Sequence, residues 1–296
     1  MHRGAGLSIA IPTYDRRESV VSLVEAIKCQ LLPKDELIVV DDGSSDGTAA
    51  ALEAIPQVKL VRHTKNQGMV RTWNNCLESA TREWVCLIHD DDALGTHALE
   101  AIRRACSIIN APGLIEHAPN GSEDTPFRCR VQDPGAWAVL HSALIPSGAT
   151  VHRSVIDEVG MFDERFIYSA DIEYFARICT RYTSVVIESP DVIKYNFHQN
   201  NYQYRTWRQP DFFSQLEEIL KLVVGYARLP DQEAQQYLRT EMTNYLRYIM
   251  HSSARNGDRI ALRKAGSVLL QIPGVDYRWR IKARVASVFG WCPRLG

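Results

Sequence analysis

The sequence lacks several features that mark other classes of protein. No apolar run reaches the roughly 18 uninterrupted residues of a membrane-spanning helix. The first residues, Met1 to Ser8, contain no apolar stretch of signal-peptide length. Lysine and arginine together number 34 against 35 acidic residues, so the basic surplus typical of nucleic-acid-binding proteins is missing. We therefore expect a cytoplasmic protein with no nucleic-acid partner.

Cysteine pairs are also missing. The seven cysteines are scattered, odd in number and never arranged as CxxC. Most lie within apolar runs, which is typical of buried thiols in a reducing compartment. We predict free cysteines and no zinc site.

Short apolar runs alternate with helical patterns through the first third of the chain. The predicted strands are 7–11, 36–40, 58–62 and 84–88, and the predicted helices are 18–30, 46–54, 68–80 and one from about residue 96. This alternation is typical of βαβ units with a mostly parallel sheet. The sequence therefore predicts an α/β fold with helices flanking a central, Rossmann-like sheet.

The rest of the chain has a different character. Residues 112–146 are rich in proline, glycine and polar residues and predict loops with short elements. Strands are expected at 147–152, 185–188 and 192–196, and helices at 153–159 and 171–181. Long amphipathic helices follow at 212–227, 231–253 and 259–270. We place a domain boundary at residue 208, ahead of a C-terminal α-helical region, 209–296.

Three predicted strands end in polar clusters: Thr13 to Asp15, Asp41-Asp42, and His89 to Asp92. Ligands of parallel sheets bind beyond the carboxyl ends of the strands, so these clusters mark a candidate site. Consecutive aspartates after an apolar strand need a positive partner, and a divalent cation suits carboxylate oxygens. The alternative is a solvated turn with Asp92 as a helix N-cap. Asp42 either accepts hydrogen bonds from a nucleobase or ribose, or belongs only to a turn.

A series of motifs in these regions resembles glycosyltransferase family 2, the inverting enzymes of GT-A fold. The resemblance covers about residues 6–200 with the family's order and spacing. It is carried by Pro12-Thr13-Tyr14-Asp15, Val40 to Thr48, Asn66-Gln67-Gly68 with Asn74, His89-Asp90-Asp91-Asp92 with Leu99, Gly148 to Arg153, Gly160 to Glu164, and Asp171-Ile172-Glu173 with Arg177.

The resemblance implies transfer of a sugar from a nucleotide diphosphate, most commonly a UDP-sugar, to an acceptor hydroxyl with inversion. Residues 1–208 are then the GT-A domain, with a nucleotide-binding half (1–110) and an acceptor-binding half (111–208). The implied base is Asp171, because single displacement needs a carboxylate to take the acceptor proton. The implied nucleotide-binding residues are Pro12, Thr13, Tyr14, Asp15, Asp42, Asn66, Gly68, Arg71 and Asp90.

The remaining implied roles concern the metal and the sugars. Asp91 corresponds to the family's principal ligand for Mn²⁺ or Mg²⁺, with Asp92, His89 and His198 as further ligands. Gly148 and Glu173 are expected beside the donor or acceptor sugar. The sequence departs from the family pattern at His89, where an aspartate is usual, at Trp73, where many relatives have arginine, and at Ala170, where a glutamate precedes the base.

The C-terminal helices are strongly basic. Residues 255–296 carry nine lysines and arginines against Asp258 and Asp276, a surplus of seven. Such a helix can lie on an anionic membrane at the inner face of the cell envelope. Alternatively its apolar face packs on the catalytic domain or on a second subunit. That face consists of Tyr277, Ile281, Val285, Val288 and Phe289.

Three functions remain open on these observations. The first is a glycosyltransferase of polysaccharide, O-antigen or glycolipid assembly, with a saccharide or lipid-linked saccharide as acceptor. The second is a nucleotidyltransferase, for which the Gly-rich phosphate loop with a basic residue is missing after the first strand. The third is a non-catalytic sugar-nucleotide-binding or assembly protein on a GT-A scaffold, against which the presence of the acidic cluster and Asp171 argues.

Overall fold

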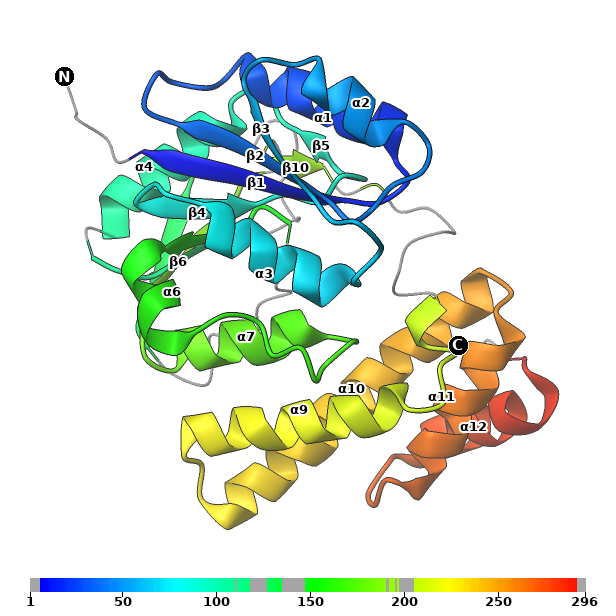
Figure 1. Ribbon diagram of the computed structural model, residues 1–296. Coiled ribbons are helices and arrows are strands. Elements are labelled where there is room, and N and C mark those ends of the chain that lie inside the picture. The colour runs from blue at the N-terminus through cyan, green and yellow to red at the C-terminus, as the bar shows by residue number, and fades with distance from the viewer. Residues whose placement is uncertain are drawn as a thin grey trace. The chain divides into compact units, whose positions relative to one another are not determined.

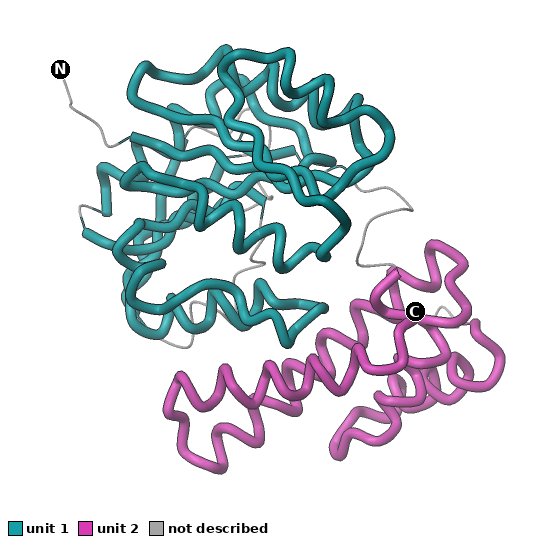
Figure 2. Tube along the Cα trace, viewed as in Figure 1, with its two compact units in different colours: residues 1–196 teal, residues 197–296 magenta. Residues whose placement is uncertain are grey.

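A computed structural model describes residues 6–109, 111–117, 127–134, 147–189, 192–194, 196 and 205–291. The chain forms two compact units, residues 1–196 and 197–296 (Figure 2). The first unit carries the sheet and the second is helical. The domain division at residue 208, and the two halves within 1–208, stay predictions.

The first unit is built on an eight-stranded mixed sheet with the order β3-β2-β1-β4-β8-β6-β9-β7 (Figure 1). Strands β1 to β4 run parallel to one another, as do β6 and β9, whereas β8 and β7 pair antiparallel with their neighbours. The predicted α/β class with a mostly parallel sheet is confirmed. The strands are β1 (Leu7–Thr13), β2 (Glu36–Asp41), β3 (Val58–Arg62), β4 (Trp84–Leu87), β6 (Leu114–His117), β7 (Cys129–Gln132), β8 (Thr150–His152) and β9 (Ser184–Ile187).

Helices cover both faces of this sheet. Alternate β1 residues Leu7, Ile9 and Ile11 join one hydrophobic core with helices α1 (Arg17–Lys28), α2 (Thr48–Glu53) and α4 (Ala98–Ile109). Successive side chains of a strand point to opposite faces, so the other β1 positions face the second helical layer. That layer contains α3 (Met69–Ser79), α6 (Arg153–Val159) and α7 (Ala170–Cys179) (Figure 1).

Strands β6 and β7 lie in the region 112–146, where the sequence predicted mainly loops. Strand β6 is buried along its whole length, yet half of it consists of Glu116 and His117. A four-residue strand with two polar residues shows neither an apolar run nor an alternating pattern, so periodicity does not reveal it. A separate two-stranded ribbon pairs β5 (Ala93–Leu94) with β10 (Ile193–Lys194), directly after the acidic cluster.

The second unit consists of α9 (Phe212–Ala227), α10 (Asp231–Arg255), α11 (Arg259–Gln271) and α12 (Tyr277–Phe289). Asp258 and Asp276 cap the last two helices, accepting hydrogen bonds from Ala261 N and Trp279 N, each at 3.1 Å. Among the described residues, no helix combines the length and the apolarity that crossing a bilayer requires.

Candidate active site

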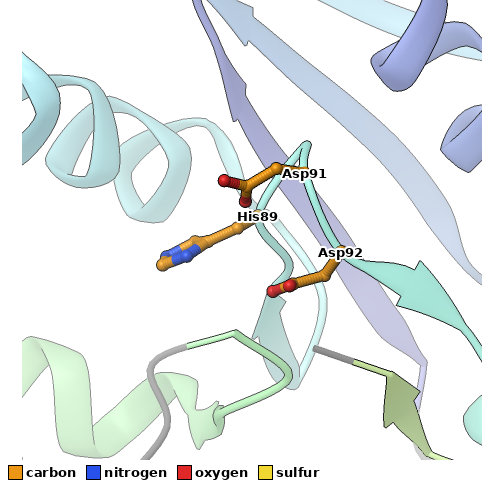
Figure 3. Close-up of side chains that lie close together, drawn as sticks. All are labelled: His89, Asp91 and Asp92. Carbon is orange, nitrogen blue, oxygen red and sulfur yellow. The ribbon is translucent and has the colours of Figure 1, made fainter. Parts of the chain in front are cut away.

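The acidic cluster forms a tight turn directly after the buried strand β4. The side chains of His89, Asp91 and Asp92 leave this turn toward the same side (Figure 3). Each offers one ligand atom, and these atoms lie within 4.8 Å of one another. A ring nitrogen with two carboxylates is a donor set that suits Mn²⁺ or Mg²⁺.

Two polar atoms of these side chains lack a hydrogen-bond partner among the described residues. Nε2 of His89 and Oδ2 of Asp92 are both buried without a hydrogen bond. Burial lowers the pKa of His89 and raises the pKa of Asp92. The imidazole is therefore neutral, which is the form that binds metals. Buried polar atoms without partners are costly, so the set fits a cation that would satisfy both.

Arg16 is the residue of this cluster that sequence analysis missed. Its guanidinium lies 2.8 Å from Asp91 and 3.6 Å from Asp90. Burial favours a higher pKa for Asp91, but the hydrogen bond and charge of Arg16 outweigh it and lower that pKa. The negative charge of Asp90 and Asp91 is therefore partly neutralised by the protein's own Arg16. The available signal was a basic residue directly after Pro12 to Asp15, at the N-cap of α1.

Asp90 joins the ends of two neighbouring strands. Its Oδ2 accepts a hydrogen bond of 2.7 Å from the Thr13 hydroxyl at the end of β1. Burial raises the pKa of Asp90 to about 7, although the charge of Arg16 opposes the shift. The Ser19 hydroxyl donates to the Asp90 backbone carbonyl. Asp90 therefore fixes the turn in place but is not one of the three clustered ligands.

The expected nucleotide-binding segments meet at the same edge. Asp15, with a positive φ of 49°, accepts a hydrogen bond of 2.7 Å from Ser45 N and donates its own N–H to the Ser44 hydroxyl. Pro12 is partly exposed beside them, and Tyr14 presents its ring to solvent. The carboxyl ends of β1 and β2 thus form one continuous polar rim, as expected for a parallel sheet.

Asp42 is already engaged by the protein. Its Oδ1 lies 2.7 Å from Nδ1 of His63 and accepts from Gln67 N at 2.7 Å, while its Oδ2 accepts from Gly68 N at 3.0 Å. The carboxylate thereby anchors the loop before α3, on which Asn66 is exposed. A nucleoside would have to share these oxygens, so the nucleoside-binding role of Asp42 stays a prediction.

Helix α3 is tied to the loop that precedes α7. Asn74 donates to Phe162 O at 3.0 Å and accepts from Phe162 N at 2.9 Å. Arg71, one of the implied nucleotide-binding residues, pairs with Glu164 at 3.0 Å, so its guanidinium has a protein partner. These bonds hold α3 against the loop between α6 and α7.

A column of aromatic rings leads from His89, in the acidic turn, to α7. Trp73 stacks on His89 with centroids 5.3 Å apart and rings 16° from parallel. Phe162 follows at 5.1 Å from Trp73, and Tyr174 lies 4.1 Å from Phe162. Two of the positions that depart from the family pattern, 73 and 89, are therefore in direct contact.

Asp171 lies one helical turn before Tyr174, in the first turn of α7. It is half-buried, and burial raises its pKa to about 6, although backbone N–H groups of Asp171 and Ile172 favour the ionised form. A carboxylate with this pKa is ionised at neutral pH and is a stronger base than an ordinary aspartate.

The expected sugar contacts have mainly structural partners in the described residues. Glu173 is buried and forms a bidentate ion pair with Arg177, both bonds 2.9 Å long. Gly148 adopts a φ of +87°, and a Cβ there would lie 2.6 Å from Ile193. His198 lies outside the described residues. Asn196, two residues earlier, donates its N–H to Asp92 at 3.3 Å.

Comparison with known proteins places these features in a family. Residues 8–107 match the sequence model for "Glycosyl transferase family 2". An uncharacterized protein of Mycobacterium tuberculosis is 26% identical over 59% of this chain and 62% of its own length. Polyprenol monophosphomannose synthase of Mycolicibacterium smegmatis is 30% identical over 35% of this chain and 40% of its own length. The matches thus span less than two thirds of either relative.

Solved structures share the architecture. S. aureus TarS 1–349 in complex with UDP-GlcNAc superposes with a TM-score of 0.65 at 16% identity, covering 96% of this chain and 89% of that one. Mannosyltransferase PcManGT of Pyrobaculum calidifontis, in complex with GDP-Man and Mn²⁺, gives 0.57 at 18% identity, covering 97% and 85%. The expected GT-A fold is confirmed, and the segment that carries the acidic turn, residues 8–107, matches the sequence model of glycosyltransferase family 2.

Proposed function

We propose that this chain is an inverting glycosyltransferase that moves a sugar from a nucleotide diphosphate to an acceptor hydroxyl. The observation that carries the proposal is the set of His89, Asp91 and Asp92 after β4, which offer one ligand atom each within 4.8 Å of one another, while a buried polar atom of His89 and one of Asp92 lack a hydrogen bond. The set lies at the rim where the nucleotide-binding segments of a family 2 domain meet. Neither a solvated turn nor a simple helix cap accounts for this combination.

A divalent cation, Mn²⁺ or Mg²⁺, would be held by His89, Asp91 and Asp92, and bound there it supplies positive charge to the leaving diphosphate. Arg16 adds a fixed positive charge at the same turn through its ion pair with Asp91. Preorganised charge of this kind stabilises a developing anion without reorganisation during the reaction. His198 stays a further proposed ligand.

The donor is proposed to be a nucleotide sugar, with a UDP-sugar as the first candidate. The similar structures are complexes with UDP-GlcNAc and with GDP-Man, which supports the class and leaves the base open. The nucleoside would lie against the rim formed by Pro12 to Asp15 and the turn after Asp42. Tyr14, whose ring is 47% exposed, offers a flat surface there.

Asp171 is proposed as the base. Its carboxylate takes the proton of the acceptor hydroxyl while the acceptor oxygen bonds to the anomeric carbon and the bond to the diphosphate breaks. Attack from the face opposite the leaving group gives inversion. A buried neighbourhood suits this role because it weakens the solvation of the carboxylate and raises its basicity.

The acceptor is proposed to be a saccharide or a lipid-linked saccharide, within polysaccharide, O-antigen or glycolipid synthesis on the cytoplasmic side of the membrane. Support comes from the relative named polyprenol monophosphomannose synthase, whose name specifies a lipid. The match spans 40% of that relative, so we propose the class of acceptor and no individual compound.

Release of nucleoside diphosphate from a panel of sugar nucleotides with Mn²⁺ or Mg²⁺ tests the proposal. We expect one donor to be hydrolysed slowly without acceptor and to raise the melting temperature of the protein when metal is present. In Asp91→Ala we expect neither the hydrolysis nor the rise in melting temperature. Asp171→Asn keeps the thermal shift but loses turnover. Asp157→Asn, an exposed aspartate on α6, is the matched control and behaves like the wild type. If no donor is turned over or shifts the melting temperature, or if pyrophosphate is released instead, the proposal fails.

A further inference from the structure

A group of exposed apolar side chains gathers at one corner of the C-terminal helical unit. Its members come from the start of α11 and the end of α12, and we call them the apolar corner. Their exposed fractions are 56% for Ile260, 61% for Val288, 67% for Phe289 and 61% for Trp291. Large side chains exposed together in this way mark an interaction surface rather than ordinary surface composition.

The packing of α11 against α12 brings these residues together. The two helices lie side by side (Figure 1), and Gly266 allows close approach because a Cβ there would lie 2.8 Å from Ala283 O. At the end of α12, Gly290 has a φ of +61°, and a Cβ at this position would lie 3.0 Å from Cβ of Arg259. The turn carrying Phe289 and Trp291 therefore sits on the first turn of α11, which carries Ile260.

Positive charge surrounds the apolar corner. Arg259 and Arg263 are exposed beside Gly290, and exposed Arg284 lies one helical turn before Val288. The acidic residues of the segment 255–291 are Asp258 and Asp276. Both form ion pairs, because Arg208 lies 2.8 Å from Asp258 and Arg247 lies 2.6 Å from Asp276. Within the segment 255–291 the rim is thus basic, and both carboxylates of that segment are paired with arginines.

We propose that the apolar corner docks on the surface of an anionic lipid bilayer, with Phe289 and Trp291 entering the headgroup region and the arginine rim binding lipid phosphates. Aromatic side chains flanked by arginines suit the boundary between lipid headgroups and acyl chains. The rings pack against apolar lipid atoms, and the guanidinium groups pair with the phosphates. A second copy of the chain is a poorer partner. A twofold contact through this corner would bring the arginine rim against itself.

The sequence alone suggested a face made of α12 residues only, and that face shares Val288 and Phe289 with the apolar corner. In the structure Ile281 and Val285 of that face are half-buried, and Tyr277 lies at the other end of α12 from the corner. The proposed surface instead draws Ile260 from α11 and Trp291 from beyond α12. It does not depend on the proposed enzymatic activity.

Co-sedimentation of the full chain with vesicles tests the docking. We expect binding to vesicles of phosphatidylcholine with phosphatidylglycerol at about 0.05 M salt, and its loss in pure phosphatidylcholine or at about 0.5 M salt. Phe289→Ser with Trp291→Ser lowers the partition coefficient by about tenfold or more. Tyr277→Ser removes a 77% exposed ring outside the corner and stays within about twofold of wild type.

A second readout covers the case in which the serine variant fails to fold. Brominated anionic lipids quench tryptophan emission on contact, and Trp291→Phe, a conservative change, reduces that quenching. The proposal is overturned if the wild-type chain does not sediment at low salt or if the folded double serine variant sediments like the wild type. It is also overturned if Trp291→Phe is quenched equally, or if the corner instead mediates a lipid-free dimer that the serine variant abolishes.

Discussion

The pH dependence of turnover follows from the surroundings of Asp171. With its pKa raised to about 6 by burial, this carboxylate is almost fully ionised at pH 7.5 and mostly protonated at pH 5. A protonated carboxyl cannot accept the acceptor proton, so kcat is expected to fall about tenfold between these two pH values. Asp171→Asn removes the base and is expected to lower kcat by about 10²-fold to 10⁴-fold at pH 7.5, with a smaller loss at pH 5, where the wild-type base is mostly protonated.

Asp90 titrates in the same range, because burial raises its pKa to about 7, and it must be separated from Asp171. Asp90 belongs to the turn that is proposed to bind the metal and nucleotide, so its protonation changes nucleotide affinity. Measuring kcat at saturating donor, and nucleotide binding by calorimetry at each pH, distinguishes the two. An acid limb in kcat without loss of binding assigns the base to Asp171. Transfer by Asp171→Asn within tenfold of wild type would refute the assignment.

The same raised pKa predicts an effect on stability. The unfolded carboxyl has an ordinary pKa near 3.8, so the folded state binds a proton more tightly and is disfavoured when Asp171 is ionised. The difference from about 6 corresponds to about 3 kcal/mol at most. Asp171→Asn should therefore raise the free energy of unfolding at pH 7.5, in urea titrations, by up to that amount. The gain should disappear below about pH 3, where the carboxyl is protonated in both states, and a loss of stability at pH 7.5 contradicts the reasoning.

Other predictions concern the residues around the site. Asn74→Ala leaves the N–H and carbonyl of Phe162 without their partner and should cost about 2–4 kcal/mol of unfolding free energy in urea. Gly148→Ala places a methyl group against Ile193 and His117 at a positive φ and should cost about 2 kcal/mol or more, whereas Gly257→Ala, also at positive φ but with open space, costs about 1 kcal/mol. Arg16→Gln removes a cation beside Asp91 and should tighten Mn²⁺ binding, measured by paramagnetic resonance, by about tenfold, because that charge no longer opposes the metal.

Local patterns were sufficient for the elements that form the N-terminal, parallel part of the sheet. The strand predicted at 58–62 coincides with β3, and the helix predicted at 68–80 differs from α3 by one residue at each end. These elements are regular βαβ units, in which side-chain periodicity and chain order alone determine the arrangement. The meeting of His89, Asp91 and Asp92 could be anticipated for the same reason, since all three belong to one turn.

Features that depend on packing between distant segments could not be read from the sequence. The guanidinium of Arg16 reaches Asp91 across 75 positions of sequence, and no local pattern indicates that pairing. Asp42 similarly binds the 63–68 loop. In both cases a polar residue has a structural partner in a distant segment, which spacing does not reveal. Glu173 is different, because its partner Arg177 lies four residues later on the same helix, and that spacing was a local signal for an ion pair.

The contact between His89 and Trp73 yields a prediction about both departures from the family pattern. The family usually has an aspartate at position 89 and often an arginine at position 73. In this chain the imidazole of His89 stacks on the indole of Trp73, which is 3% exposed. His89→Asp alone would bury a carboxylate beside Asp91 and Asp92, and Trp73→Arg alone would bury a guanidinium against a neutral ring, so each should be strongly destabilising.

In the double variant the two new charges face each other and neutralise one another. The double substitution should therefore be less destabilising than the sum of the single changes, with a coupling energy of about 1–3 kcal/mol. Urea unfolding of the four proteins, followed by circular dichroism with EDTA present to exclude metal, measures this coupling. Additivity within about 0.5 kcal/mol would show that the two positions vary independently. A favourable coupling instead means that the histidine at position 89 requires the tryptophan at position 73. The two departures from the family pattern are then a single change in the packing that supports the turn His89 to Asp92.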